Sequence, residues 1–143
     1  MDWKRIIGAG IVFAIIAQVM HTIEAFLTMN YYTMPDYFAV WSKVMMPTAG
    51  PPPMEFYVIS IVFGIITGVI FAAVYSMFKD NVPGAGTKKG LCYGGILFLV
   101  AGIPFGLTMY LLINLPMMLL VWWNIFSLII YLIGGIVIEK IVR

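Results

Sequence analysis

Charged residues are scarce in this sequence. Only 10% of its 143 residues are Asp, Glu, Lys or Arg, whereas 63% are hydrophobic and the mean hydropathy is +1.05. Soluble domains are roughly 25% charged and about 45–50% apolar, so this composition excludes an ordinary soluble domain. The chain is therefore predicted to be an integral membrane protein.

Cysteine and histidine occur only once each, as Cys92 and His21. A lone cysteine cannot form a disulfide within one chain, which excludes dithiol relay chemistry. The sequence also lacks a zinc-ligand pattern, a phosphate-binding loop, a haem-ligand pair and a nucleophile triad. We predict no cofactor, and nothing in the sequence indicates an enzyme.

Long apolar runs are abundant, in contrast to charge. A run of about 20 apolar residues crosses a hydrocarbon core of roughly 30 Å. Four runs meet this length, at residues 6–28, 56–78, 90–113 and 117–138. Because the connections between them are short, residues 1–143 are predicted to be a single all-α membrane domain, a bundle of four transmembrane helices.

The basic residues indicate how these spans are oriented. Of the eight Lys and Arg residues, all but Lys43 lie before the first span, between the second and third, or after the fourth. Since positive loops stay in the cytoplasm, both termini are expected there, with residues 29–55 outside the cell membrane. The net charge of +2 reflects this bias, so we expect the lipid bilayer as partner and no nucleic acid.

A faint internal repeat relates the two halves of the chain. "GAGIVFAII" from Gly8 aligns with "YGGILFLVA" from Tyr93, and "SIVFGIITGVI" from Ser60 aligns with "SLIIYLIGGIV" from Ser127. The pattern predicts two parallel-repeated helical hairpins. Gene duplication and convergent apolar composition both account for it.

The connection between the first two spans contains an amphipathic stretch. In "PDYFAVWSKVMM", the apolar residues Tyr37, Val40, Trp41, Val44 and Met45 recur at the helical period. We predict a short external helix at the membrane interface over residues 35–46, stopped by the proline that follows. It is either an anchor that caps the bundle or a lid over an outward-facing cavity.

Polar residues form a stripe within the first span. Gln18, His21, Glu24 and Thr28 fall on neighbouring positions of one helix face and must face protein or water. The other spans supply polar groups at similar depths. The candidates for lining a cavity or binding an ion are Gln18, His21, Glu24, Ser60, Thr108, Asn124 and Ser127.

Glu24 is the least easily explained of these candidates. A carboxylate at the bilayer centre costs at least about 3 kcal/mol, although one closer to the boundary can partly reach water. The functional interpretation is a proton or cation carrier influenced by His21, one turn away. The alternatives are a neutralised or snorkelling side chain and, for the stripe as a whole, interhelical hydrogen bonds that only hold the helices together.

Metal binding has partial support. His21 and Glu24 have a spacing suited to two ligands of one metal, and Met29 adds a thioether, a ligand type that suits Cu(I). Methionine also fills apolar surfaces without binding anything. No closed metal site is predicted, and copper handling is kept as an alternative.

Pro104 interrupts the third span. It leaves the Val100 carbonyl without its helical donor, so a kink is expected there. A bent helix beside the polar stripe can line a cavity or can reflect packing alone.

Several stretches resemble a known group of proteins. They are "WKR" before the first span, the acidic end of that span, the Trp-containing external segment, "PGAGTKKG" before the third span and "LPMMLLVWW" at the fourth. The chain resembles an uncharacterised family of small four-helix prokaryotic integral membrane proteins. The resemblance implies a fold and no activity. That family often has an acidic residue where Ser127 stands here, so a paired-carboxylate site is not implied for this chain.

Three interpretations of function follow. The first is a small transporter or channel-like protein with an outward-facing polar cavity around His21 and Glu24. The second is a structural or accessory membrane subunit without transport activity, and the third is the copper-handling protein. A homo-oligomer, most simply a homodimer, is expected because four helices enclose little space.

Overall fold

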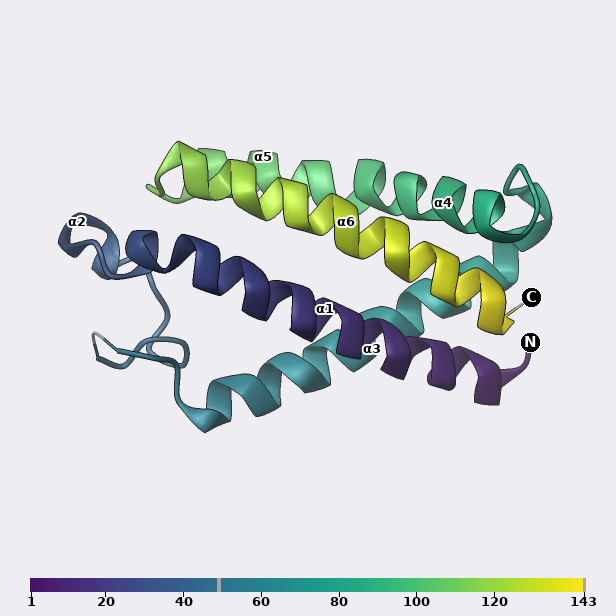
Figure 1. Cartoon of the computed structure of the whole chain (residues 1–143), viewed down its shortest axis with the longest axis horizontal. Coiled ribbons are helices and arrows are strands. Elements are labelled where there is room, and N and C mark those ends of the chain that lie inside the picture. Colours follow the sequence, from purple (N-terminus) through teal and green to yellow (C-terminus); the bar gives the residue numbers. More distant parts are fainter. Residues whose placement is uncertain (49, 143) are drawn as a thin grey trace.

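The computed structural model describes residues 1–48 and 50–142. In this part of the chain every regular element is a helix, and no strand is present, which confirms the all-α four-helix bundle (Figure 1). The elements are α1 (Trp3–Tyr32), α2 (Pro35–Phe38), α3 (Met54–Phe78), η1 (Lys79–Asn81), α4 (Gly86–Leu97), η2 (Phe98–Gly102), α5 (Ile103–Leu112) and α6 (Met117–Val142).

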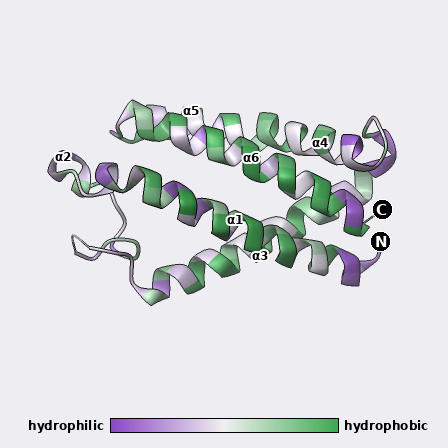
Figure 2. Cartoon of the chain, in the orientation of Figure 1, coloured by the Kyte–Doolittle hydropathy of each residue, from purple (hydrophilic) through white to green (hydrophobic). Residues whose placement is uncertain are grey.

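Four helical segments are long and apolar enough to cross a membrane. They are Trp3–Tyr32, Met54–Asn81, Gly86–Leu112 and Met117–Val142, with 30, 28, 27 and 26 residues. A span needs about 20 residues, so each segment exceeds this length. Figure 2 shows the hydrophobic residues along the helices and hydrophilic residues concentrated at their ends and in the connections. By length and composition, the chain is a multi-pass membrane protein.

Both termini lie at one end of the bundle, which we call the terminal end, and α2 lies at the opposite end, the α2 end (Figure 1). The main helix packing runs from α3 to α1, from α1 to α6 and from α6 to α4. Helices α1 and α6 therefore form the centre of the molecule. Asp2 begins α1, because its carboxylate accepts hydrogen bonds from the Lys4 and Arg5 amides at 3.1 and 3.3 Å.

Glycines allow the two helices of each hairpin, α1 with α3 and α4 with α6, to pack backbone against backbone. A Cβ added to Gly68 of α3 would lie 2.5 Å from the Gly10 carbonyl oxygen of α1. In the second hairpin, a Cβ on Gly94 would collide with the Tyr131 carbonyl, and one on Gly135 with the Gly90 carbonyl. Small residues permit this approach because they remove the side chains between the helices. Gly68 and Gly135 occupy equivalent positions in the sequence repeat.

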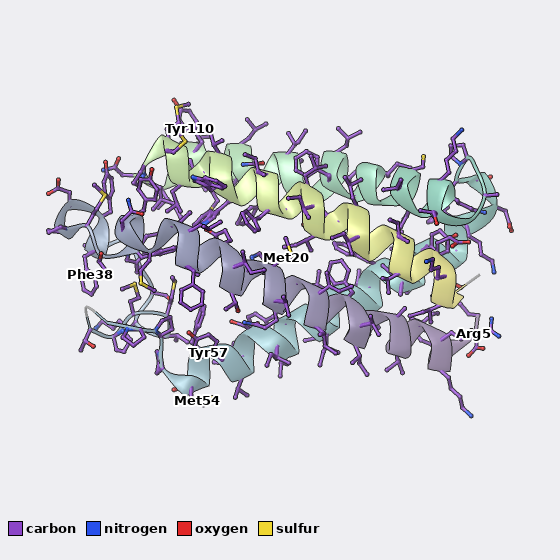
Figure 3. The ribbon with its side chains drawn as sticks, in the orientation of Figure 1. Arg5, Met20, Phe38, Met54, Tyr57 and Tyr110 are labelled. Carbon is purple, nitrogen blue, oxygen red and sulfur yellow. The ribbon has the colours of Figure 1, made fainter. Side chains whose placement is uncertain are left out.

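Two helices pack on the bundle over only part of their length. The buried residues of α3 are Gly68, Ala72 and Tyr75, all in its second half. Within Ile103–Leu112, which forms α5, no side chain is buried. In Figure 3, Met20 lies between α1 and α6, whereas Met54 and Tyr57 mark the first turns of α3, away from α6. At the α2 end, α3 and α5 therefore pack less closely on the central helices α1 and α6.

Aromatic rings fill the middle of the bundle. Phe13 and Phe71 meet edge to face with centroids 5.5 Å apart, and Phe71 meets Tyr131 in the same way at 5.7 Å. Phe98 lies 6.5 Å from Tyr131 on the other side. We call Phe13, Phe71, Phe98 and Tyr131 the aromatic layer. It brings together side chains from α1, α3, η2 and α6.

The external helix is shorter than predicted. The sequence predicted a helix over residues 35–46, but α2 ends at Phe38 and turns continue to Met46. Two hydrogen bonds explain the difference. Trp41 Nε1 donates to the Tyr32 carbonyl at 3.0 Å, and Ser42 Oγ accepts from the Met45 amide at 3.2 Å. The first ties the segment to the end of α1, and the second starts a new turn.

The third span is irregular just before Pro104. Residues Phe98–Gly102 form a π-helical turn, and α5 begins at Ile103 with Pro104 in its first turn. A π turn accommodates the missing proline amide by shifting the hydrogen bonds that precede it. This is the position at which the sequence predicted a kink.

Candidate functional site

Glu24 is buried in a hydrogen-bonded site on α1. Its side chain is 4% exposed. Thr28, one turn later, donates its hydroxyl to Glu24 Oε1 at 2.6 Å and lies 2.8 Å from the Glu24 carbonyl oxygen. Tyr32, two turns later, donates its hydroxyl to the same Oε1 at 3.4 Å. This spacing of four residues places the three side chains on one face of the helix.

Tyr32 extends this network to other elements. Its hydroxyl accepts a hydrogen bond from Trp123 Nε1 of α6 at 2.9 Å, and its carbonyl accepts one from Trp41 Nε1 at 3.0 Å. The Tyr32 and Trp41 rings are 4.9 Å apart, and the Trp41 and Trp123 rings 6.3 Å. We call Glu24, Thr28, Tyr32, Trp41 and Trp123 the Glu24 cluster. The cluster joins α1, α6 and the segment after α2.

The chemistry of the cluster depends on whether Glu24 carries a proton. An ionised carboxylate only accepts hydrogen bonds, and the two hydroxyl groups beside it act as donors. A protonated carboxyl is itself a donor, so it would compete with the Thr28 and Tyr32 hydroxyls for acceptors. Tyr32 also accepts a hydrogen bond from Trp123, so Glu24 is connected through Tyr32 to a contact between α1 and α6.

The remaining polar residues of α1 lie outside this cluster. Gln18 is half-buried, and His21 is exposed on the helix surface. Gly10 opposes Gly68 and Ala14 opposes Gly64 along the antiparallel α1–α3 pair. Continuing this register places Gln18 level with Ser60 on the loosely packed side of α3.

The Ser60 and Thr108 hydroxyls are each satisfied within their own helix. Ser60 Oγ donates to the Phe56 carbonyl, and Thr108 Oγ1 donates to the Pro104 carbonyl, both at 2.8 Å. Ser60 is half-buried, whereas Thr108 is exposed. Neither hydroxyl is directed to the Glu24 cluster by a hydrogen bond.

Asn124 belongs to a different surface. Its Nδ2 donates to the Leu120 carbonyl at 2.8 Å, and its amide packs against Gly106 of α5. It lies in an open groove of about 530 Å³ between α5 and α6. The groove is lined by Ile103, Gly106, Leu107, Tyr110, Met117, Leu120, Val121, Asn124 and Ile125. Ser127, one turn further along α6, is half-buried. The predicted candidates thus divide among at least three places.

The described residues contain no group of side chains that could bind a metal ion. Over residues 1–48 and 50–142, no three His, Cys, Asp or Glu side chains gather in a way that could hold an ion. The three residues of the copper alternative lie in different surroundings, because Glu24 is buried while His21 and Met29 are exposed.

Sequence reasoning selected Glu24 and Thr28 but not Tyr32 or Trp123. Tyr32 and Trp123 are 91 residues apart in the chain, and no spacing rule connects them. Tyr32 also lies beyond the predicted end of the first span. The available signal was the interval of eight residues from Glu24 to Tyr32, which places both on one helix face.

Comparison with known proteins adds no functional information. The chain matches no protein-family model, no curated protein and no solved structure.

Proposed function

We propose that this chain is a small membrane transporter or channel-like protein that carries protons, or a cation in their place, with Glu24 as the binding group. The observation that carries the proposal is the burial of the Glu24 carboxyl in a network that reaches α6 through Tyr32 and Trp123. Ionisable groups at membrane depth are expensive to bury, and they commonly mark ion or proton pathways.

The network supplies a means of coupling binding to helix movement. Loss or gain of a proton at Glu24 changes which groups donate and accept around Tyr32. Tyr32 is one of the points at which the α2 end of α1 is held to α6. Two binding states of Glu24 would therefore favour two arrangements of this helix pair, which is the requirement for a ligand-driven switch.

With the orientation proposed from the basic residues, the α2 end would lie outside the cell. Glu24 would then exchange protons with the exterior from the α2 end, where α3 and α5 pack less closely on α1 and α6. The aromatic layer lies deeper in the bundle and would separate the Glu24 cluster from the terminal end. This arrangement supports an outward-facing site in place of an open pore.

The accessory-subunit interpretation rests on a different feature of the same cluster. Thr28, Tyr32, Trp41 and Trp123 each have a hydrogen-bond partner within it. A fully bonded network of this kind can hold three segments together without any transport role. The two proposals differ in whether the proton on Glu24 exchanges.

Proton flux into liposomes tests the transporter proposal. The purified protein is reconstituted with a pH-sensitive dye trapped inside, and flux is driven by a potassium diffusion potential. We expect Glu24→Gln to lower the flux at least about tenfold, because an amide of the same shape cannot bind the proton. Infrared titration of the carboxyl band in the same samples reports whether Glu24 exchanges its proton.

Glu55→Gln is the matched control, because Glu55 is an exposed glutamate in the first turn of α3. It should leave the flux unchanged. A flux that Glu24→Gln does not alter, together with a carboxyl band that does not respond to pH at Glu24, would reject the transporter in favour of the accessory subunit.

A further inference from the structure

A second carboxyl is buried at the terminal end of the bundle. Glu139 of α6 is 4% exposed. Among the described residues, its Oε2 is the buried side-chain oxygen or nitrogen that has no hydrogen-bond partner. A buried carboxylate oxygen without a donor is unfavourable, and such groups gain stability by binding a proton or another ligand.

The packing of α6 explains why Glu139 is buried. Gly135, one turn earlier on the same helix face, contacts Gly90 and Gly94 of α4. Continuing this antiparallel pairing by one turn places Glu139 beside the first turn of α4. The buried residues Ile6, Ile138 and Val142 form the apolar core at this end. Protein packing therefore removes water from the carboxyl, although Glu139 lies close to the end of its helix.

The neighbouring groups stabilise both forms of this carboxyl. The N-terminus of α4 carries partial positive charge and has no side-chain cap, so it favours the ionised form. The apolar packing favours the neutral acid. Tyr75 of α3 lies within electrostatic reach of both Glu139 and Asp80. The titratable and charged groups at this end, on α6 itself and on the elements around it, include Asp2, Lys4, Arg5, Tyr75, Lys79, Asp80, Lys88, Lys89, Cys92, Tyr93 and Lys140.

We propose that Glu139 is a second proton-binding site, which exchanges its proton with the side of the membrane where both termini lie. A proton is the ligand that a single carboxyl can bind alone. A divalent metal would need further acidic, histidine or cysteine ligands, and no such group of three gathers in the described part of the chain.

The position of Glu139 complements that of Glu24. Along α6, Glu139 lies about 24 Å from Trp123, the residue of that helix in the Glu24 cluster. The aromatic layer crosses the bundle between them. The proposal that Glu139 binds a proton does not depend on the function of Glu24. The use of Glu139 as the inward station of a transport path rests on the proposed function of Glu24.

Infrared titration can isolate Glu139 directly. The chain has three glutamates, Glu24, Glu55 and Glu139, so the double variant Glu24→Gln, Glu55→Gln retains Glu139 as its sole glutamate. When this variant is made with carbon-13 glutamate, its isotope-shifted carboxyl band belongs to Glu139. We expect the band to gain intensity reversibly as the pH falls, and to be absent from the triple variant that adds Glu139→Gln.

The proposal would be overturned if the intensity of the Glu139 band did not change with pH. It would also be overturned if no band appeared at any pH, provided that circular dichroism shows the variant to be helical. The flux assay separates this result from the proposed function. If Glu24→Gln abolishes flux while the Glu139 band does not titrate, the second site is wrong and the transporter stands. If the Glu139 band titrates but Glu24→Gln leaves flux unchanged, the second site stands without a transport role.

Discussion

The Tyr32 hydroxyl links α1 to α6 through its hydrogen bond with Trp123. It accepts from Trp123 and donates to Glu24, so Tyr32→Phe removes both hydrogen bonds and leaves the indole N–H of Trp123 without its partner. We expect Tyr32→Phe to lower the free energy of unfolding in detergent by about 1–2 kcal/mol. Denaturant unfolding followed by circular dichroism measures the change.

Tyr31→Phe provides the comparison, because it removes the same atom from the adjacent position, outside the Glu24 cluster. It should change the unfolding free energy by less than about 0.5 kcal/mol. Equal losses in the two variants would show that the Tyr32 hydrogen bonds do not contribute specifically.

Single residues show where sequence reasoning succeeds and where it stops. Glu24 can be selected because a carboxylate inside an apolar run is unusual whatever surrounds it. Its bonding to Thr28 follows from helix geometry, whereas its link to Trp123 depends on how two distant helices pack. Glu139 was missed because the predicted fourth span ended at residue 138, which placed the carboxyl in the aqueous boundary instead of against α4.

At the scale of elements, the α4–α6 contact depends on glycine. A methyl group on Gly94 would collide with the backbone at Tyr131 and Leu132, whereas nothing lies within 4 Å of the Cβ position of Gly95. We expect Gly94→Ala to destabilise the folded protein by about 1–3 kcal/mol, because the helices must move apart. Gly95→Ala should be neutral or stabilising by up to about 1 kcal/mol, since alanine favours the helix.

Thermal unfolding of the two variants in the same detergent checks this pair. The substitutions are chemically identical and one residue apart, so any difference in midpoint reports on helix packing. A Gly94→Ala midpoint equal to or above that of Gly95→Ala would contradict the backbone contact.

The helices themselves were predictable, because each long apolar run needs all its backbone hydrogen bonds satisfied internally. The positions at which the helices end were less predictable. Helix α1 continues to Tyr32, beyond the apolar run, where Tyr32 is bonded to Trp41 and Trp123. The segment after Phe38 follows a helical pattern but forms turns, because the hydrogen bond from Trp41 to Tyr32 fixes its path. Tertiary contacts decided both outcomes.

At the scale of the whole molecule, the proposed orientation can be tested by labelling. In a Cys92→Ala background, we expect Ser42→Cys to react with a membrane-impermeant maleimide in intact cells. Thr87→Cys, in the opposite connection, should react only after the membrane is permeabilised, because the positive residues keep that loop in the cytoplasm. Both positions are exposed in the structure. Labelling of Thr87→Cys in intact cells would reverse the orientation, and with it the assignment of Glu24 to the exterior.

Helix α3 crosses α1 and packs closely against it over only part of its length. Helix α3 is in close contact with α1 at Gly68, against Gly10, and at Gly64, against Ala14, and the part of α3 beyond these contacts runs from Gly64 back to Met54, a length of roughly 15 Å at the α-helical rise. No residue between Met54 and Gly64 is fully buried, so this part of α3 packs on the bundle only through half-buried side chains. A rotation of about 10° at these contacts would move the Met54 end of α3 by roughly 3 Å, close to the diameter of a water molecule. A small change at the glycine contact would thus control how far water reaches along the polar side of α1.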